Sequence, residues 1–139
     1  NSFQIFVTIK IYLKIIGVSL VLLAFVHVIF PKYFNWKEEL RPLSLMNRQM
    51  MKVHTFFIAF VVFLIGVLCL TSSQSLIGTD LGKTICLGLA IFWGVRFFFQ
   101  LFWYSPKLWR GKTFETIVHV VFTCFWAFMT WVFLSVYLK

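Results

Sequence analysis

The chain has 139 residues, of which 61% are hydrophobic, 21% are aromatic and only 12% are charged. A soluble domain carries roughly 25% charged residues, so the composition excludes an ordinary water-soluble fold and predicts a protein whose solvent is the lipid bilayer. The net charge of +9 is concentrated beside long apolar stretches, where basic residues meet lipid head groups, and we therefore expect no nucleic acid to bind.

Four apolar stretches are long enough to cross about 30 Å of hydrocarbon, which takes roughly 20 helical residues. We expect helices over residues 5–30, 46–70, 81–104 and 113–138. Short loops make neighbouring helices antiparallel. The sequence therefore predicts an all-α fold in a single transmembrane domain, residues 1–139: an integral membrane four-helix bundle of up-down-up-down topology.

The expected helix ends follow from capping residues and prolines. Pro31 is expected to close the first helix, and Ser105-Pro106 the third. Ser44 is the expected N-cap of the second helix, and Thr113 of the fourth.

Basic residues are distributed unequally between the two ends of the predicted helices. The end formed by loops 31–45 and 105–112 carries eight of them: Lys32, Lys37, Arg41, Arg48, Lys52, Lys107, Arg110 and Lys112. The opposite end carries Lys10, Lys14, Lys83 and Lys139, of which Lys10 and Lys14 are expected to extend toward the head groups. Because basic residues favour the cytoplasmic side, we predict that both long basic loops are cytoplasmic and that both termini lie outside.

Ionisable and amide side chains recur near the predicted cytoplasmic end of all four helices. They are His27, His54, Arg96, Gln100, Glu115 and His119. Arg96 and Gln100 are four residues apart, as are Glu115 and His119, so each pair shares a helix face. At about 1.5 Å per residue, the six groups lie roughly 3–12 Å inside the boundary. An ionisable group at the membrane centre costs about 2.5–3.5 kcal/mol on insertion scales, so their shared depth predicts a site that faces the bundle interior.

A transition metal or haem is one ligand that this set of residues predicts. Neutral imidazole is the commonest ligand of transition metals. A metal would be held by His27, His54, Glu115 and His119, because bundle interiors build metal sites from facing helices. Alternatively, two of the histidines are the axial ligands of a haem, with Arg96 beside a propionate.

An amphipathic molecule such as a lipid, an isoprenoid or a quinone is the second ligand class. Its polar head would contact His54, Arg96, Gln100 and His119, and its tail would lie among Phe and Trp side chains. A His-Glu pair is suited to general acid–base work. No reaction type is indicated, so the catalytic residues and the status as an enzyme stay unassigned.

The same residues also fit a non-catalytic accessory or structural subunit of a larger membrane complex, or a homo-oligomer. Buried polar groups then serve helix packing. Glu115 would be favoured in the first turn of its helix by the helix dipole, with Arg96 as its counter-charge. His27 would bond to a loop carbonyl, and Gln100 would join two helices.

The cysteines and one glycine carry smaller expectations. Cys69, Cys86 and Cys124 show no metal-binding spacing. We expect free thiols at Cys69 and Cys86, which flank one loop, and a small packing residue at Cys124. Ala90 and Gly94 form a pair of small residues that is expected to admit a neighbouring helix closely.

Overall fold

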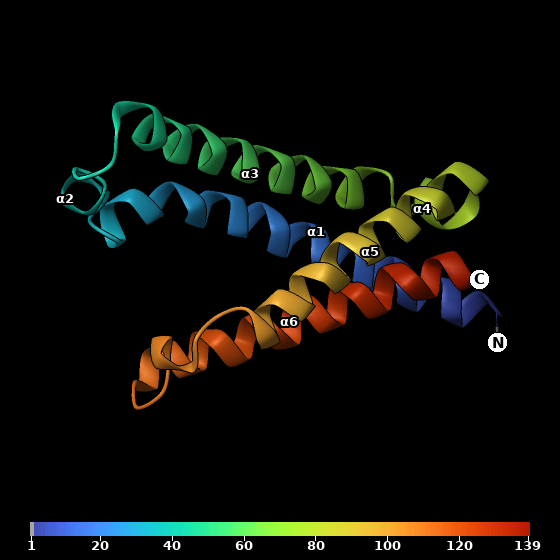
Figure 1. Ribbon diagram of the computed structural model, residues 1–139. Coiled ribbons are helices and arrows are strands. Elements are labelled where there is room, and N and C mark those ends of the chain that lie inside the picture. Colours follow the sequence, from blue (N-terminus) through green and yellow to red (C-terminus); the bar gives the residue numbers. More distant parts are fainter. Residues whose placement is uncertain (1) are drawn as a thin grey trace. The chain divides into compact units, whose positions relative to one another are not determined.

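The computed structural model describes residues 2–139, which form helices joined by short turns, with no β-strand among them. The elements are α1 (Ser2–Tyr33), α2 (Trp36–Glu39), α3 (Leu45–Thr71), α4 (Ser73–Gly78), α5 (Asp80–Phe102), the short 3-10 helix η1 (Pro106–Leu108) and α6 (Thr113–Leu138) (Figure 1). Four of these helices, α1, α3, α5 and α6, are long and apolar enough to cross a membrane. The predicted all-helical class with four long apolar helices is confirmed.

Capping side chains explain where two of the long helices begin. The Ser44 hydroxyl accepts a hydrogen bond from the backbone N–H of Asn47 at 3.2 Å, as predicted for the start of α3. The hydroxyl of Thr79 does the same for α5, accepting from the N–H of Gly82 at 2.9 Å. The prediction for α6 was wrong by one residue, because Lys112 occupies the N-cap position without a side-chain bond and Thr113 is the first helical residue.

Pro31 does not close α1, which continues to Tyr33. A proline removes only its own N–H from the helix, and the backbone bonds resume beyond it, since the N–H of Phe34 donates to the carbonyl of Phe30 at 2.9 Å. The helix stops where Asn35 adopts the left-handed conformation with φ 54°, which asparagine tolerates better than most residues. The expected end at residue 30 was therefore wrong by one turn.

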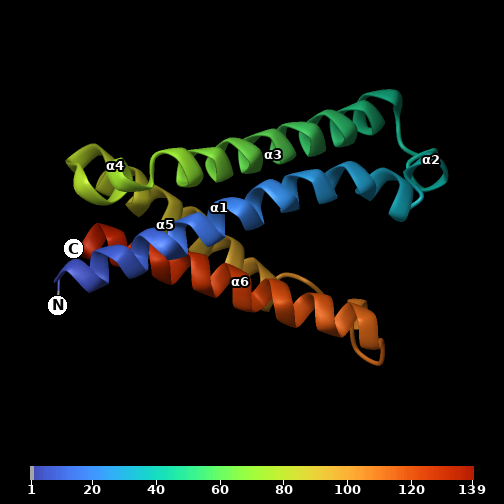
Figure 2. The same cartoon turned by 180° about the vertical axis from the view of Figure 1, so that it is seen from behind.

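The chain divides into two compact units. One comprises Ile11–Ser73, and the other comprises the residues up to Lys10 together with Gln74–Lys139. The first unit contains most of α1 with α2 and α3, and the second contains α4, α5, η1 and α6. Opposite views show α3 alongside α1 and α6 alongside α5 (Figures 1 and 2).

Two glycines set the packing of α1 on α3 in the unit Ile11–Ser73. A Cβ atom added at Gly17 would lie 2.8 Å from the carbonyl oxygen of Gly66, and one added at Gly66 would lie 2.9 Å from the carbonyl oxygen of Gly17. Only residues without side chains let two backbones meet so closely. Because Lys14 contacts Leu70 while Gly17 contacts Gly66, the two helices are antiparallel.

Lys14 adds a polar contact to the same pair of helices. Its ammonium group donates to the carbonyl oxygen of Leu70, one of the last carbonyls of α3. These carbonyls have no partner within the helix, and a cation near them is favoured by the helix dipole. Lys14 was expected to extend toward the head groups. Its exposed side chain instead donates a hydrogen bond to a carbonyl oxygen at the end of α3.

The hairpin of α5 and α6 dominates the other unit. Its buried side chains include Trp93 on α5 and Trp126, Met129 and Phe133 on α6. A Cβ atom added at Gly94 would lie 3.6 Å from the Thr130 methyl group, which is an ordinary contact. Gly94 thus faces α6 but does not force a close approach.

Apolar side chains cover the outside of all four long helices. Only 17–33% of the most apolar stretch of each is buried within the protein.

The cysteines form no disulfide with one another, since Cys86 is a fully buried free thiol and is not bonded to Cys69. Cys124 is a free thiol on the exposed side of α6. The expectation that Cys124 is a packing residue was wrong.

Candidate functional site

Three of the predicted site residues form one hydrogen-bonded chain between α5 and α6. Arg96 Nη1 donates to Gln100 Oε1 at 3.2 Å, one turn further along α5. Gln100 Nε2 lies 3.1 Å from Nδ1 of His119 on α6. Gln100 is 7% exposed, while Arg96 and His119 are half-buried. The structure thus brings Arg96, Gln100 and His119 together.

The direction of these bonds determines the proton position on His119. A guanidinium only donates, so the Gln100 oxygen must face Arg96, and its NH₂ group must face His119. Nδ1 of His119 therefore accepts, and the proton of the neutral imidazole lies on Nε2. The groups that this chain leaves unused include the remaining N–H groups of Arg96 and the Nε2–H of His119, which are donors.

Aromatic rings enclose both ends of this hydrogen-bonded chain. The His119 ring stacks on Trp109 with centroids 3.7 Å apart and an interplanar angle of 13°. The guanidinium carbon of Arg96 lies 5.5 Å from the centroid of Tyr104 and 5.2 Å from that of Trp126. Cation–π contacts contribute about 0.5–2 kcal/mol each, which offsets part of the cost of holding Arg96 away from bulk water.

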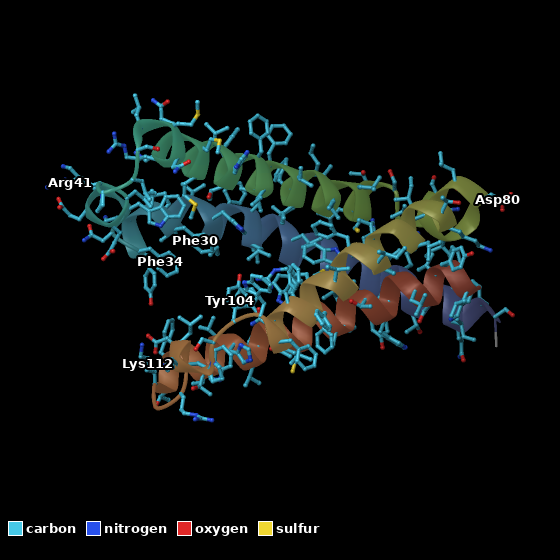
Figure 3. The ribbon with its side chains drawn as sticks, in the orientation of Figure 1. Phe30, Phe34, Arg41, Asp80, Tyr104 and Lys112 are labelled. Carbon is cyan, nitrogen blue, oxygen red and sulfur yellow. The ribbon has the colours of Figure 1, made fainter. Side chains whose placement is uncertain are left out.

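The loop before α6 is fixed where it meets the site. The Thr116 hydroxyl donates to the carbonyl oxygen of Trp109 at 2.6 Å, which holds the indole over His119. Figure 3 places Tyr104 just beyond α5 and Lys112 just before α6, so the site lies at the loop end of this hairpin.

Two tryptophans extend the site along the hairpin. Trp93 and Trp126 stack with centroids 5.0 Å apart and planes 7° apart. They are 2% and 5% exposed, and within residues 2–139 their indole nitrogens are the buried side-chain nitrogen or oxygen atoms without a hydrogen-bond partner. A buried donor left unsatisfied costs about 1–3 kcal/mol. These N–H groups are two more donors without a partner, and one of them belongs to the ring that Arg96 contacts.

Arg96 has no carboxylate partner in this hairpin. Glu115 was a candidate counter-charge, but it is exposed on α6, and Arg96 bonds to Gln100 instead. Asp80 lies sixteen residues away on α5, a distance of about 24 Å along a helix. The predicted pair of Arg96 with Glu115 was wrong, because Arg96 bonds to Gln100 and Glu115 lies exposed in the first turn of α6.

His27 lies on α1, in the unit Ile11–Ser73. Its Nδ1 is 2.8 Å from the carbonyl oxygen of Leu23, so this nitrogen carries the proton and donates to the preceding turn. The ring also packs on Phe30, with centroids 4.7 Å apart. His27 does bond to a backbone carbonyl, but to one in its own helix rather than in a loop.

His54 lies on α3 in the same unit and is exposed. The expectation that it faces a protein interior was wrong, because the buried residues of α3 are Val62, Gly66 and Cys69. Among residues 2–139, no group of three or more His, Cys, Asp or Glu side chains could hold a metal ion. The metal set of His27, His54, Glu115 and His119 is divided between the two units, two residues in each.

The aromatic contacts of the site were not predicted. The sequence predicted Phe and Trp side chains around a ligand tail, but not the contacts of Arg96 with Tyr104 and Trp126 or of His119 with Trp109. The four-residue spacing from Trp93 to Phe97 and from Phe122 to Trp126 shows aromatic faces beside Arg96 and His119. Many other apolar residues of these helices have the same spacing, so the sequence does not distinguish the rings that contact Arg96 and His119 from rings that only pack.

Comparison with known proteins gives no match: no family model fits the chain, and no curated protein and no solved structure matches it significantly.

Proposed function

We propose that this chain is a multi-pass membrane protein that binds an amphipathic ligand at the loop end of α5 and α6. The observation that carries the proposal is the half-buried chain of Arg96, Gln100 and His119. A charged side chain within an apolar helix is costly, and such residues usually mark the site of a ligand or partner. The aromatic rings of Tyr104, Trp109 and Trp126 suit the apolar part of that ligand.

The membrane location is supported by the outer surface of the helices. Exposed phenylalanine, leucine, isoleucine and valine side chains cover α1, α3, α5 and α6, and water is a poor solvent for so continuous an apolar surface. The up-down-up-down order, the cytoplasmic position of the long basic loops and the outer position of both termini belong to this proposal.

A small amphipathic molecule is favoured over a metal or haem by the chemistry of His119. A metal takes a lone pair from imidazole, but Nδ1 of His119 already accepts from Gln100 and Nε2 carries the proton. Coordination would need a change of tautomer and the loss of the bond to Gln100. Binding of an amphipathic ligand by Arg96, Gln100 and His119 needs no such change. His54, which is exposed, is no longer part of the proposed ligand site.

The alternative is a structural role, as an accessory subunit of a larger complex or in a homo-oligomer. It is favoured by one observation: Gln100 joins α5 to α6 through His119, and such a bond stabilises a hairpin without any ligand.

An inventory of the purified protein distinguishes these functions. The protein is extracted in a mild detergent, and its organic solvent extract is examined by mass spectrometry beside that of Arg96→Met. We expect a lipid or isoprenoid that copurifies at near-stoichiometric amount with the wild type and is lost from the variant. A stoichiometric metal or a haem absorbance band would contradict the proposal, and identical extracts would favour the structural role.

The membrane topology is tested separately, in a variant without native cysteines. Lys112→Cys and Ser75→Cys place single thiols just before α6 and in the short helix α4, at opposite predicted ends of the long helices. A membrane-impermeant maleimide added to intact cells should label Ser75→Cys only, and the reverse pattern would overturn the proposed orientation.

A further inference from the structure

We infer that the α5–α6 site is selective for an anionic head group that only accepts hydrogen bonds, a carboxylate or a phosphate carried on an apolar tail. This inference rests on the proposed amphipathic ligand and names its chemistry.

The first step is the inventory of hydrogen-bonding groups. A guanidinium has five N–H donors, and within the described chain Arg96 uses one of them, toward Gln100. His119 presents its Nε2–H, since Nδ1 is occupied by Gln100. The buried indole N–H groups of Trp93 and Trp126 have no partner. These N–H groups are donors without a partner, and only a hydrogen-bond acceptor satisfies them.

The second step is charge. The chain has four acidic residues against thirteen basic ones. Two of the acidic residues, Glu38 and Glu39, lie in α2 in the other unit. Glu115 is exposed and Asp80 is at the far end of α5. The guanidinium of Arg96 thus lies over two aromatic rings without a carboxylate to balance its charge, and a ligand that brings a negative charge is favoured over a neutral acceptor such as a quinone.

The third step is the shape of the donor group. The guanidinium is planar and offers two parallel N–H bonds to a carboxylate or a phosphate. Its carbon lies over the rings of Tyr104 and Trp126, and of its five N–H donors one is used by Gln100, which leaves four for a ligand. The exposed phenylalanines of α5, Phe98 and Phe102, flank the same end of the helix and provide an apolar surface for a tail.

The test compares probes that differ only in charge. Dibromostearic acid is paired with its methyl ester, and brominated phosphatidic acid is paired with brominated phosphatidylcholine. Each probe is added to the protein in neutral detergent at a pH where the acids are ionised, and quenching of tryptophan fluorescence by bromine is followed against the mole fraction of probe. The pairs keep the same tails, so a difference within a pair reports the head group.

Arg96→Met is the test variant, and Arg110→Met is its matched control, which removes the same charge from an exposed loop position. Arg96→Lys keeps the charge but loses the planar donor edge. Size-exclusion chromatography and circular dichroism establish that each variant is folded.

For the wild type, we expect at least one anionic probe to saturate at a concentration about tenfold or more below that of its neutral partner, as a hydrogen bond to a charged group implies. Arg110→Met should keep this preference, Arg96→Lys should reduce it and Arg96→Met should lose it. The pair that shows the preference identifies a carboxylate or a phosphate as the source.

Equal binding of the anionic and neutral probes, lost in Arg96→Met, would overturn the inference while leaving the amphipathic site in place. A preference that persists in Arg96→Met would also overturn it, because the cation responsible would lie elsewhere. Should no probe saturate in the wild type, the proposed function fails together with the inference.

Discussion

The side-chain nitrogen of Gln100 lies 3.1 Å from Nδ1 of His119, and this contact joins α5 to α6. The oxygen of the same Gln100 amide accepts from Arg96. Gln100 therefore cannot exchange its contact with His119 without also losing its contact with Arg96. Flipping the amide would place its NH₂ group against the guanidinium, donor against donor. The three residues therefore act as one unit.

Replacing His119 tests this unit directly. His119→Phe keeps a ring that stacks on Trp109 but removes the acceptor for Gln100. Because Gln100 is only 7% exposed, its NH₂ group is left without a partner. We expect a loss between about 0.6 kcal/mol, the average for hydrogen bonds between membrane helices, and about 1.7 kcal/mol, the largest value, seen as a lower midpoint of thermal unfolding in detergent. The same change at the exposed His54 is the control and should leave the midpoint unchanged; equal shifts for both variants would contradict the hydrogen-bonded arrangement.

Close packing of α1 on α3 is tested by adding single methyl groups. Gly66→Ala brings a Cβ atom to 2.9 Å from the Gly17 carbonyl oxygen, so the helices must separate. Overpacking of this kind costs about 1–3 kcal/mol. Gly88→Ala is the matched control in α5, where nothing lies within 4 Å of the added atom, and it should stabilise by up to about 1 kcal/mol.

Unfolding midpoints of the two alanine variants report the difference. If Gly66→Ala were as stable as Gly88→Ala, the backbone contact between α1 and α3 would be refuted.

The elements that the sequence predicted well are those fixed by local chemistry. Apolar length alone predicts the four long helices, and Ser44 caps α3 because a serine hydroxyl reaches the N–H three residues on. The helix end predicted from Pro31 was wrong, because a proline in the last turn removes one hydrogen bond without ending the helix. The short helices α2 and α4 were not predicted, because four to six residues carry too little periodicity to be recognised.

The site was predicted only where spacing on one helix determines proximity. Arg96 and Gln100 are four apart and do bond, and His119 meets them because α5 and α6 are joined by a short loop. Glu115 and His119 are also four apart, but Glu115 is exposed while His119 is half-buried. Shared depth grouped His54 with this set, but depth along a helix does not fix the direction in which a side chain points.

The contact of Lys14 with the end of α3 gives a local prediction. Lys14→Met removes the cation from the Leu70 carbonyl, and the helix dipole term lost is about 0.3–1 kcal/mol. The last turn of α3 should then open more often. Hydrogen exchange followed by mass spectrometry should show faster exchange in peptides covering 66–72, with peptides from α6 unchanged; unchanged exchange at 66–72 would contradict this role of Lys14.

Thiol accessibility tests the outward face of α6. Cys124 is exposed and Cys86 is fully buried. N-ethylmaleimide added to the folded protein in detergent should modify Cys124 well before Cys86, and both should react alike after denaturation. Mass spectrometry of the digested protein measures each site, and prior modification of Cys86 would show that α5 is turned differently.

Trp126 separates the contribution of its ring from that of its N–H group. Trp126→Phe keeps an aromatic face for Arg96 and removes a buried donor that has no partner, so the relief of about 1–3 kcal/mol from the unsatisfied group offsets much of the lost packing. Trp126→Leu also removes the cation–π contact, which adds a loss of about 0.5–2 kcal/mol. Thermal unfolding in neutral detergent should rank the wild type and Trp126→Phe close together with Trp126→Leu clearly lower. Equal losses in both variants would show that the Arg96 guanidinium gains nothing from the aromatic face and that size alone matters at this position.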